Sequence, residues 1–273
     1  MRFDAYLLPR LVRPQQLRGA AVVVVDVLRA TTTIATALAA GARRVVPTVS
    51  VSEARRAAQE HRRGRTVLGG ERRGLRIPGF ALGNSPGEYT AATVGGSTVV
   101  FTTTNGTRAL ARCRLARHVL LAALVNVGAV CSKLAAHKHW HVVCAGTRGE
   151  VTCEDVLLAG MLWHVWRALH PAAERGCWND QAELAACMAS TACGSDLLAY
   201  ATQLARGASA TPSRQLIAAA QQVLEHSAGG RNLVAIGLSE DIAAAVQIDL
   251  VNVVPVWKPA ANEIIPARPD SLP

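Results

Sequence analysis

The sequence predicts an α/β protein of three layers, in which a largely parallel or mixed sheet is flanked by helices. Continuous apolar, strand-like runs alternate along the chain with alanine-rich segments of helical period. Strands that are apolar on both faces are typical of a sheet covered on both sides. The chain has 273 residues, 50% of them hydrophobic, which is enough for one sizeable core. We therefore expect a single domain over residues 1–273, with a helical insertion at about 172–227.

Three segments share one order of elements: an apolar strand, a turn of small or hydroxyl residues, and a helix. The predicted strands are Ala21–Val27, Ser97–Phe101 and His141–Cys144. The turns are Arg29–Thr33, Thr102–Thr107 and Ala145–Gly149, and the helices are Ile34–Ala40, Arg108–Cys113 and one near Glu154–Leu162. Because ligands bind beyond the carboxyl ends of parallel strands, we expect these turns to converge on one crevice.

Two further elements lie between the first two units. Val45–Val49 is predicted as a strand, and Val51–Arg62 as a helix that Ser52 caps. The segment Leu68–Gly87 is too rich in glycine and proline for a helix or a strand, so we predict a long functional loop there.

The last third of the chain is predicted to be mostly helical. The helical pattern runs from Ala172 to about Ser227, with breaks at Gly194 and around Gly207–Pro212. A helix at Ser239–Val246 and a strand at Leu250–Val254 follow.

The composition argues against several classes of protein. The net charge is +10, but the basic residues are scattered and lack interleaved aromatics, so we expect no nucleic-acid partner. Seven cysteines without a C-x-x-C pair favour reduced thiols over disulfides or structural zinc. The first residues lack the apolar core of a signal peptide, and no uninterrupted apolar run approaches about 18 residues. We expect a cytoplasmic protein with no membrane segment. Its sequence is compatible with assembly into a homo-oligomer.

The three turns are predicted to bind an anion. Helix N-termini present unpaired N–H groups and the positive end of the helix dipole, while threonine hydroxyls and arginines add donors. Ordinary capping of the helices by Ser and Thr is the alternative for any single turn. The candidate substrate-binding residues are Arg29, Thr31, Thr32, Thr33, Asn84, Ser85, Thr102, Thr103, Thr104, Asn105, Gly106, Thr107, Arg108, Thr147 and Arg148.

Few acidic residues lie near these turns, which makes their positions informative. Asp26 ends a valine run, where an unpaired carboxylate is costly. Glu71 lies in the glycine-rich segment, and Glu154 and Asp155 open a helix, where they could simply complement its dipole. Carboxylates would repel a phosphate unless a metal stood between them, and hard oxygen ligands suit Mg²⁺. We predict Mg²⁺ as cofactor with Asp26, Glu71, Glu154 and Asp155 as ligands, and Asp26, Glu71 and Asp155 as catalytic residues.

His137, His139 and His141 alternate just before the third strand, so they would share one face of an extended backbone. Such a row could bind a transition metal, and an exposed strand end is the alternative. We assign these histidines no role in the reaction. The sequence contains no G-x-x-x-x-G-K-[ST] loop, which argues against a P-loop enzyme.

Taken in order, the motifs of the chain resemble those of the 2-phosphosulfolactate phosphatase family. The segments that carry the resemblance are DVLRATTT (26–33), GGERRGLRIPGFALGNSPGEY (69–89), TTTNGTRAL (102–110), Asn126, CAGTRG (144–149) with EDVLLAG (154–160), and GLSEDIAAAVQID (237–249) with Val254–Pro255. The resemblance implies an α/β phosphoric monoester hydrolase that releases phosphate from 2-phospho-3-sulfolactate in a Mg²⁺-dependent reaction. It also implies a small anionic phosphorylated substrate and a step toward coenzyme M.

Our mechanistic hypothesis is metal-assisted hydrolysis. Mg²⁺ is held by Asp26 with Glu71 and with Asp155 or Glu154, while the threonine turns, Arg29 and Arg108 hold the phosphate oxygens. A carboxylate orients the attacking water, or Asp26 attacks directly. Two other functions stay open: a phosphatase for another small phosphorylated acid or sugar, and a non-catalytic anion-binding protein on the same fold.

Overall fold

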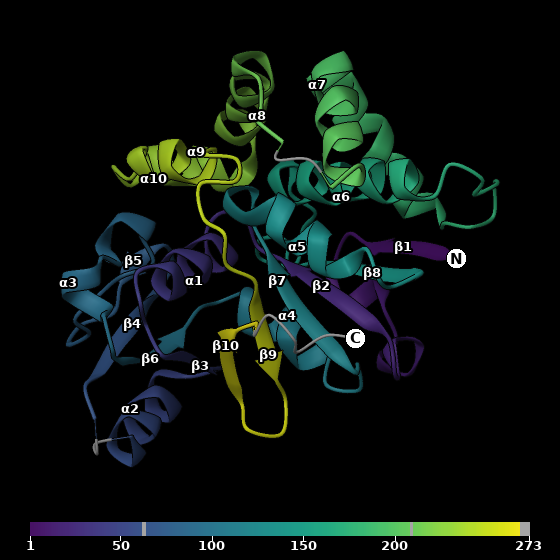
Figure 1. Cartoon of the computed structure of the whole chain (residues 1–273). Coiled ribbons are helices and arrows are strands. Elements are labelled where there is room, and N and C mark those ends of the chain that lie inside the picture. The colour runs from purple at the N-terminus through teal and green to yellow at the C-terminus, as the bar shows by residue number, and fades with distance from the viewer. Residues whose placement is uncertain (62–63, 208–209, 268–273) are drawn as a thin grey trace.

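The computed structural model describes residues 1–61, 64–207 and 210–267, and a ten-stranded mixed sheet forms its centre (Figure 1). The strands are β1 Arg2–Tyr6, β2 Ala21–Val25, β3 Arg44–Thr48, β4 Thr66–Arg72, β5 Leu75–Arg76, β6 Thr98–Thr102, β7 His118–Ala122, β8 His139–Cys144, β9 Pro255–Lys258 and β10 Glu263–Pro266. Their order across the sheet is β1-β8-β2-β7-β9-β10-β3-β6-β4-β5.

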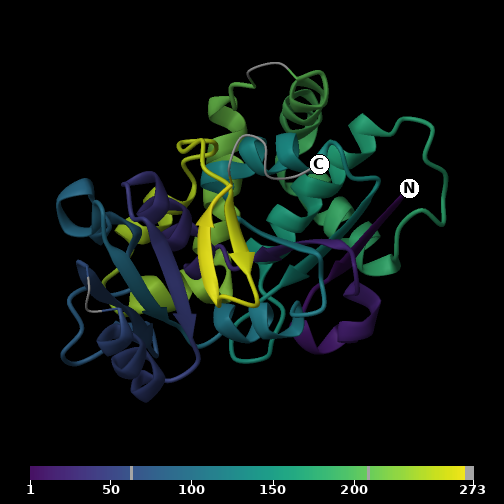
Figure 2. The same ribbon diagram turned by 60° about the horizontal axis from the view of Figure 1, so that its bottom comes forward.

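The sheet consists of two parallel halves that a hairpin joins. β1, β8, β2 and β7 run parallel to one another, and so do β3, β6 and β4. The hairpin of β9 and β10 pairs antiparallel with β7 on one side and with β3 on the other. Figure 2 brings this hairpin, drawn in yellow, to the front between the two halves. The predicted α/β class is confirmed, with a mixed sheet whose halves run in opposite directions.

Helices cover both faces of the sheet. Their bounds are α1 Ala30–Ala39, α2 Val51–Glu60, α3 Ala91–Val94, α4 Gly106–Arg112, α5 Val127–Leu134, α6 Cys153–Leu169, α7 Asp180–Ala205, α8 Arg214–His226, α9 Ala228–Ala235 and α10 Glu240–Ala245, with short 3-10 turns at η1 Pro9–Leu11, η2 Pro14–Leu17, η3 Pro86–Glu88 and η4 Leu124–Asn126. Helices α6 to α10 follow one another between β8 and β9, so the insertion predicted at 172–227 is part of a longer helical region.

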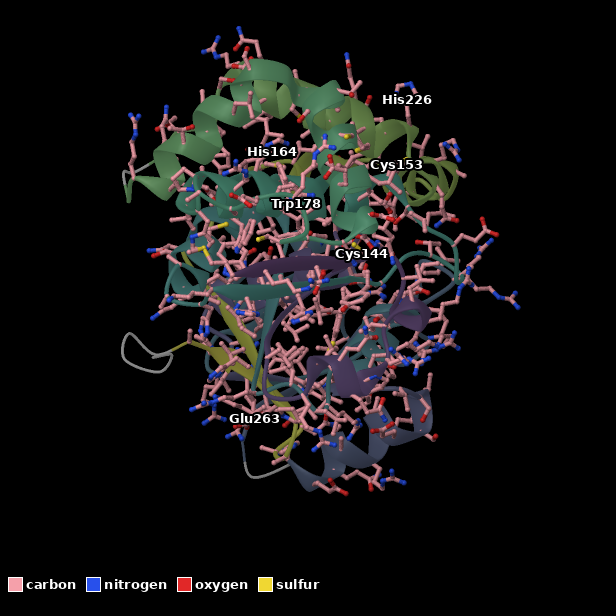
Figure 3. All side chains as sticks on the ribbon, turned by 90° about the vertical axis from the view of Figure 1, so that its right-hand side faces the viewer. Cys144, Cys153, His164, Trp178, His226 and Glu263 are labelled. Carbon is pink, nitrogen blue, oxygen red and sulfur yellow. The ribbon has the colours of Figure 1, made fainter. Side chains whose placement is uncertain are left out.

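The two faces of β2 show why the valine run forms a central strand. Val23 and Val25 belong to an apolar cluster that includes residues of α5, α6 and α7. Val22 and Val24 belong to the cluster on the opposite face, which includes residues of α1 and α4. Figure 3 shows the layer of α6 to α10 beyond the sheet, with His164 inside it and Cys144 at its border with the sheet. Successive side chains of a strand point to opposite faces, so this continuous apolar run buries both.

The prediction of a loop at Leu68–Gly87 is wrong for the first part of that segment, up to Arg76, because strands β4 and β5 form there. The glycines of β4 serve close packing between chain segments. A Cβ at Gly69 would lie 2.2 Å from Tyr89 Oη, and one at Gly70 would lie 2.1 Å from the carbonyl oxygen of Thr102. Glycine in this strand therefore marks a close approach, which composition alone cannot distinguish from a loop.

Two other boundaries differ from the prediction. Ser50, rather than Ser52, caps α2, because its Oγ accepts a hydrogen bond from Glu53 N, and the predicted last residue of that helix, Arg62, lies outside the described residues. The strand predicted at Leu250–Val254 is wrong, because the last two strands begin at Pro255. The segment Leu250–Val254 instead lies alongside η4, and Val251 N donates a hydrogen bond to the carbonyl of Val125. The predicted break at Gly194 is confirmed by its φ of 56° within α7. The break predicted around Gly207–Pro212 lies partly outside the described residues.

Among the described residues, helix α7 is long and apolar enough to cross a membrane by length and composition alone. A helix packed inside a folded domain meets the same two criteria. Helix α7 contributes Ala185, Ala189 and Leu197 to the cluster that α6 and the sheet share, so it forms part of the helical layer in this structure (Figure 1).

We predict that Gly160→Ala destabilises the protein. At Gly160, α6 packs closely against α7: a Cβ would lie 2.1 Å from the carbonyl oxygen of Ala185 and 2.6 Å from Ala189 Cβ. The clash should lower the free energy of unfolding by about 1–3 kcal/mol, despite the better helix propensity of alanine. Urea denaturation measures the change. Gly87→Ala is the control, because a Cβ there meets nothing within 4 Å, and equal stabilities of the two variants would contradict the packing.

Candidate active site

A cavity of about 440 Å³ lies where the turns after several strands meet. Its walls come from the turns that follow β2, β4, β6 and β8 and from helix α9. The lining residues are Asp26, Leu28, Arg29, Glu71, Arg73, Gly74, Asn84, Thr103, Thr104, Asn105, Thr147, Arg148, Glu150, Ala228, Gly229, Asn232 and Leu233. The structure thus brings the three predicted turns together with Glu71 and Asn84 of the predicted functional loop, and it adds helix α9, which the sequence did not indicate.

Asp155 fastens the turn after β2 to the turn after β8. Its Oδ1 accepts a hydrogen bond of 2.9 Å from Val27 N, and its Oδ2 accepts one of 2.9 Å from Gly146 N. The side chain is buried and does not line the cavity. Burial, together with the charges of Glu154 and Asp26, raises the pKa of Asp155. Both carboxylate oxygens are bonded to the backbone, so the predicted catalytic residue and metal ligand is placed in a positioning role.

Glu71 makes a similar connection on the other side of the cavity, but it also lines the wall. Its Oε1 accepts hydrogen bonds from Thr104 N at 2.9 Å and from Thr104 Oγ1 at 3.0 Å. Its Oε2 accepts a hydrogen bond of 2.8 Å from Gly74 N. Glu71 therefore holds the turn after β6 against the turn between β4 and β5.

Asp26 is the buried carboxylate of the cavity wall that retains an unbonded oxygen within the described residues. Its Oδ1 accepts a 3.2 Å hydrogen bond from Ala30 N, the first residue of α1. A Cβ at Gly106 would lie 2.9 Å from Asp26 Oδ2 and 3.4 Å from Thr103 Oγ1, so glycine leaves room for these two oxygens. Burial above all, and then the charges of Glu71 and Glu154, raise the pKa of Asp26 to about 7, against the lowering effects of Ala30 N–H and Arg29.

Glu154 lies just behind the cavity wall. A Cβ at Gly229, a lining residue, would lie 2.3 Å from Glu154 Oε1, while Glu154 Oε2 is buried without a hydrogen-bond partner. Burial raises the pKa of this carboxyl group, and the hydroxyls of Ser227 and Thr152 act in the opposite direction. The predicted ligand is thus near the cavity but separated from it by the backbone of α9.

The oxygen atoms on the cavity wall fit a hard divalent cation. Asp26 and Glu71 supply carboxylates there, and Asn84 Oδ1 and Thr103 Oγ1 are buried oxygens without a hydrogen-bond partner. The described residues contain no group of three or more His, Cys, Asp or Glu side chains arranged to hold a metal. Mg²⁺ is commonly bound by one or two carboxylates plus water and substrate oxygens, so this smaller donor set suits it. The four-carboxylate ligand set predicted from the sequence is not assembled.

The threonines at the start of α1 are occupied by the backbone. Thr31 Oγ1 donates to the carbonyl of Asp26 at 2.8 Å, Thr32 Oγ1 to that of Val27 at 2.7 Å, and Thr33 Oγ1 to that of Asn84 at 2.9 Å. All three side chains are buried and none lines the cavity. Because α1 begins at Ala30, these residues form its first turn, and the capping alternative describes them better than contact with an anion.

In the second and third turns, some of the predicted residues line the cavity and others bond only to protein groups. Thr102 accepts a hydrogen bond from Arg72 and Thr107 donates to the carbonyl of Thr103, and neither lines the cavity. The lining residues predicted in these turns are Thr103, Thr104, Asn105, Thr147 and Arg148, and Gly106 lies behind them against Asp26. In the third turn, Gly146 N and Arg148 N donate to protein side chains, which leaves the hydroxyls and guanidinium groups as donors for a ligand.

The arginines differ in how much of their charge is available. Arg29 lines the cavity, but it is buried in an ion pair of 2.6 Å with Asp241, which also accepts from Ser85. Arg108 is exposed and does not line the cavity. Arg148 and Arg73 line it, and no hydrogen bond or ion pair engages either guanidinium within the described residues. Arg148 and Arg73 are therefore the cations best placed to meet an anionic ligand.

Some lining residues were not predicted from the sequence. Arg73 lies in the glycine-rich segment directly after Glu71 and Arg72, where the run of charged residues was the available signal. Gly229, Asn232 and Leu233 come from α9, Ala228–Ala235, which begins just after the helical region predicted at 172–227 and carries no predicted motif. Their contribution depends on the packing of α9 over the strand ends, which no local pattern records.

Comparison with known proteins relates the chain to one family. The family model for 2-phosphosulpholactate phosphatase matches residues 6–260. A relative described as a probable 2-phosphosulfolactate phosphatase, from Symbiobacterium thermophilum, is 36% identical over 244 residues, which cover 89% of this chain and 93% of that protein. Relatives with the same description from Pseudothermotoga lettingae and Caldanaerobacter subterraneus are 44% and 42% identical over 159 residues, or 58% of this chain and 66% of each relative.

We predict that Asp26→Asn stabilises the metal-free protein at alkaline pH. The folded-state pKa of Asp26, about 7, lies above its ordinary value of 3.8, so the wild type loses stability as the pH rises between these values. At pH 8 the variant should be more stable by up to about 4 kcal/mol, and near pH 4 the two proteins should be equal. Calorimetry in EDTA measures this difference.

Asp180→Asn, at the exposed start of α7, controls for a general loss of negative charge. It should show no comparable gain between pH 4 and pH 8. An Asp26→Asn protein no more stable than the wild type at pH 8 would contradict the raised pKa.

Proposed function

Because the chain belongs to the 2-phosphosulpholactate phosphatase family, we propose that it hydrolyses the phosphate monoester of 2-phospho-3-sulfolactate in a Mg²⁺-dependent reaction. The products are sulfolactate and phosphate. The observation that carries this proposal is the cavity at the strand ends, where the buried carboxyl group of Asp26 shares the lining with the unpaired guanidinium groups of Arg73 and Arg148.

The charges of the cavity match those of the proposed substrate. Phosphosulfolactate carries a phosphate, a carboxylate and a sulfonate, and an arginine can bind each of them through two parallel hydrogen bonds. Arg29 is already paired with Asp241, so Arg73 and Arg148 are the residues to which we assign the ionic contacts with the substrate. Asn105 and Asn232, on different walls, can supply further hydrogen bonds.

The carboxyl group of Asp26 is suited to accept a proton from the water that attacks the phosphate. Its Oδ1 is held by Ala30 N while its Oδ2 is unbonded, and its pKa of about 7 lets it accept a proton near neutral pH. Asp26, Glu71, Asn84 and Thr103 would hold Mg²⁺, which when bound supplies neutralisation of phosphate charge. Asp26 either orients the attacking water or attacks phosphorus directly, and rapid quenching followed by mass spectrometry detects a phosphorylated chain in the second case.

The other assignments made from the sequence remain predictions. They are the link to coenzyme M, the cytoplasmic location and the absence of a nucleic-acid partner. The family and the cavity also suit a phosphatase for another small phosphorylated acid. A non-catalytic anion-binding protein on this fold would need neither the poised Asp26 nor its unbonded oxygen, so we favour catalysis.

We predict that the purified protein releases phosphate from 2-phospho-3-sulfolactate with Mg²⁺ and loses this activity in EDTA. 2-Phospholactate, which lacks only the sulfonate, is the matched substrate. Since a hydrogen bond to a charged group contributes about 1.5–3 kcal/mol, its kcat/KM should be lower by about 10- to 100-fold. A phosphate-release assay on both esters, with and without Mg²⁺, measures the difference.

Asp26→Asn is the control for catalysis at this cavity and should be inactive on both esters. Equal turnover of the two esters would overturn the assignment of the sulfonate while leaving a phosphatase. Full Mg²⁺-dependent turnover by folded Asp26→Asn would overturn the role of Asp26. Phosphate release from no ester would favour the anion-binding alternative.

We predict that Arg148→Ala and Arg108→Ala differ sharply, although the motif pattern treats both as ligands. Arg148 lines the cavity and Arg108 does not. Removing one charged hydrogen bond to the substrate should lower kcat/KM about 10- to 100-fold in Arg148→Ala. Arg108→Ala should stay within about twofold of the wild type, because its surface charge is screened. Steady-state kinetics decide the matter, and a larger loss in Arg108→Ala would contradict the placement of the two side chains.

A further inference from the structure

A second pocket, of about 400 Å³, lies at the amino ends of β2 and β8. It is formed by the end of η2 with the segment that follows it, and by the start of β8 with the two residues that precede it. Its lining residues are Gln16, Arg18, Gly19, Ala20, Ala21, His137, Lys138, His139 and His141. The pocket therefore contains the histidine row that the proposed reaction does not use.

This pocket is separate from the candidate active site. β2 starts at the pocket with Ala21 and ends with Val25, next to Asp26 of the active-site cavity. Five residues of extended strand span about 17 Å, and the two sets of lining residues have no member in common. A ligand bound here would not contact the substrate.

The lining of the pocket carries positive charge only. Arg18 and Lys138 contribute a guanidinium and an ammonium group, and none of the described aspartates or glutamates lines the pocket. Within the described residues neither basic side chain is engaged by a hydrogen bond or an ion pair. Concave surfaces of one sign concentrate counter-ions, so this pocket favours an anion.

Two imidazole nitrogens of the lining histidines, His137 Nε2 and His141 Nδ1, are buried without a hydrogen-bond partner, so these two atoms face the protein interior and not the pocket. His141 is about nine-tenths buried. It stacks on Tyr6 at 6.2 Å between ring centroids, and its Nδ1 lies 3.8 Å from Asp4 Oδ2, beyond hydrogen-bond range. Asp4 is already held by Arg2 at 2.7 Å and does not line the pocket, so it leaves the donor capacity of His141 unused.

His137 has a second set of neighbours. Its ring lies 5.5 Å from that of His118, and the charge of Arg117 is felt at both rings, with Lys258 acting on His118 as well. A positive charge on His139 would also lower the pKa of His141. Burial first, and then these neighbouring cations, lower the pKa of His118 and His137, and burial lowers that of His141 despite Asp4. The rings are therefore mostly neutral near pH 7, and a nearby anion would raise their pKa.

A transition metal is the competing ligand for such a row of histidines. The described residues contain no group of three or more His, Cys, Asp or Glu side chains arranged to hold a metal. The fixed charges of Arg18 and Lys138 also oppose a cation, whereas both favour an anion.

We propose that the pocket at the amino ends of β2 and β8 is a second binding site, for a small oxyanion that carries at least two negative charges. Arg18 and Lys138 neutralise the anion, and His137, His139 and His141, which line the pocket, add positive charge beside it when protonated. The chemistry fits the phosphate groups of a phosphorylated metabolite, and a di- or tricarboxylate presents the same kind of charge in another geometry. Binding strengthens as the pH falls through the histidine pKa range.

Pyrophosphate is the probe, and the histidine imidazole signals in NMR spectra of the full-length protein are the readout. No histidine lines the active-site cavity, so binding there leaves these signals unaffected by direct contact. The signals of His137, His139 and His141 should shift with saturation at a midpoint below about 1 mM, and more tightly at pH 6 than at pH 8 by about tenfold. Citrate, titrated in parallel, distinguishes a carboxylate ligand from a phosphate one.

The double variant Arg18→Ala/Lys138→Ala should weaken pyrophosphate binding at these histidines at least tenfold while its phosphatase activity and Tm stay unchanged. Arg206→Ala/Arg214→Ala, which removes two exposed charges from α7 and α8, is the matched control and should bind as the wild type does. Linear shifts without saturation, equal losses in the two double variants, or saturable binding of Zn²⁺ but not of either anion would each overturn the proposal.

Discussion

The carboxylate of Asp155 is the constraint on which the candidate active site depends. It lies at the start of α6, yet its two oxygens accept the N–H groups of Val27 and Gly146, which follow β2 and β8. One side chain thus fixes the two turns and the helix relative to one another. Glu71 does the same for the turns after β4 and β6, and Asp241 fastens α10 to Arg29. The cavity walls are held by buried acidic groups that bond to donors from distant parts of the chain.

These connections leave the cavity with an electrostatic imbalance. Asp26, Glu154 and Asp155 are all buried, and burial raises the pKa of each. The fully bonded Asp155 has its charge spread over two N–H groups, whereas Asp26 keeps Oδ2 unbonded beside Gly106. A carboxyl group in that state gains from any cation or proton that reaches it. The same imbalance lowers the stability of the protein when Asp26 is ionised, and it leaves this carboxyl group ready to bind a proton or a cation.

Much of the fold could be predicted from the sequence, because strand, turn and helix alternate with local signals. A local signal also identified Asp26 as a candidate site residue, because a carboxylate at the end of Val22–Val25 breaks the apolar pattern. The use of each hydroxyl could not be predicted: Thr33 bonds to the carbonyl of Asn84, which is 51 residues away in the chain. Local sequence likewise cannot show that Gly69 and Gly70 lie in a strand, because the atoms that exclude a side chain there belong to Tyr89 and Thr102.

The two halves of the sheet run in opposite directions, yet their strands contribute to one cavity. The rule that ligands bind beyond the carboxyl ends of parallel strands does not by itself predict this. In a flat sheet, strands that run in opposite directions would place their carboxyl ends at opposite edges. Between β7 and β3 lie the two strands of the hairpin, and each pairing adds about 20–25° of twist, so the halves are turned well away from a straight opposition. The ends of β2 and β6 do meet, because Gly106 packs against both Ala30 and Asp26, where a Cβ would lie 2.9 Å from each side chain. The site therefore requires a residue without a side chain at position 106. This contact between the two halves explains the glycine in the motif TTTNGT.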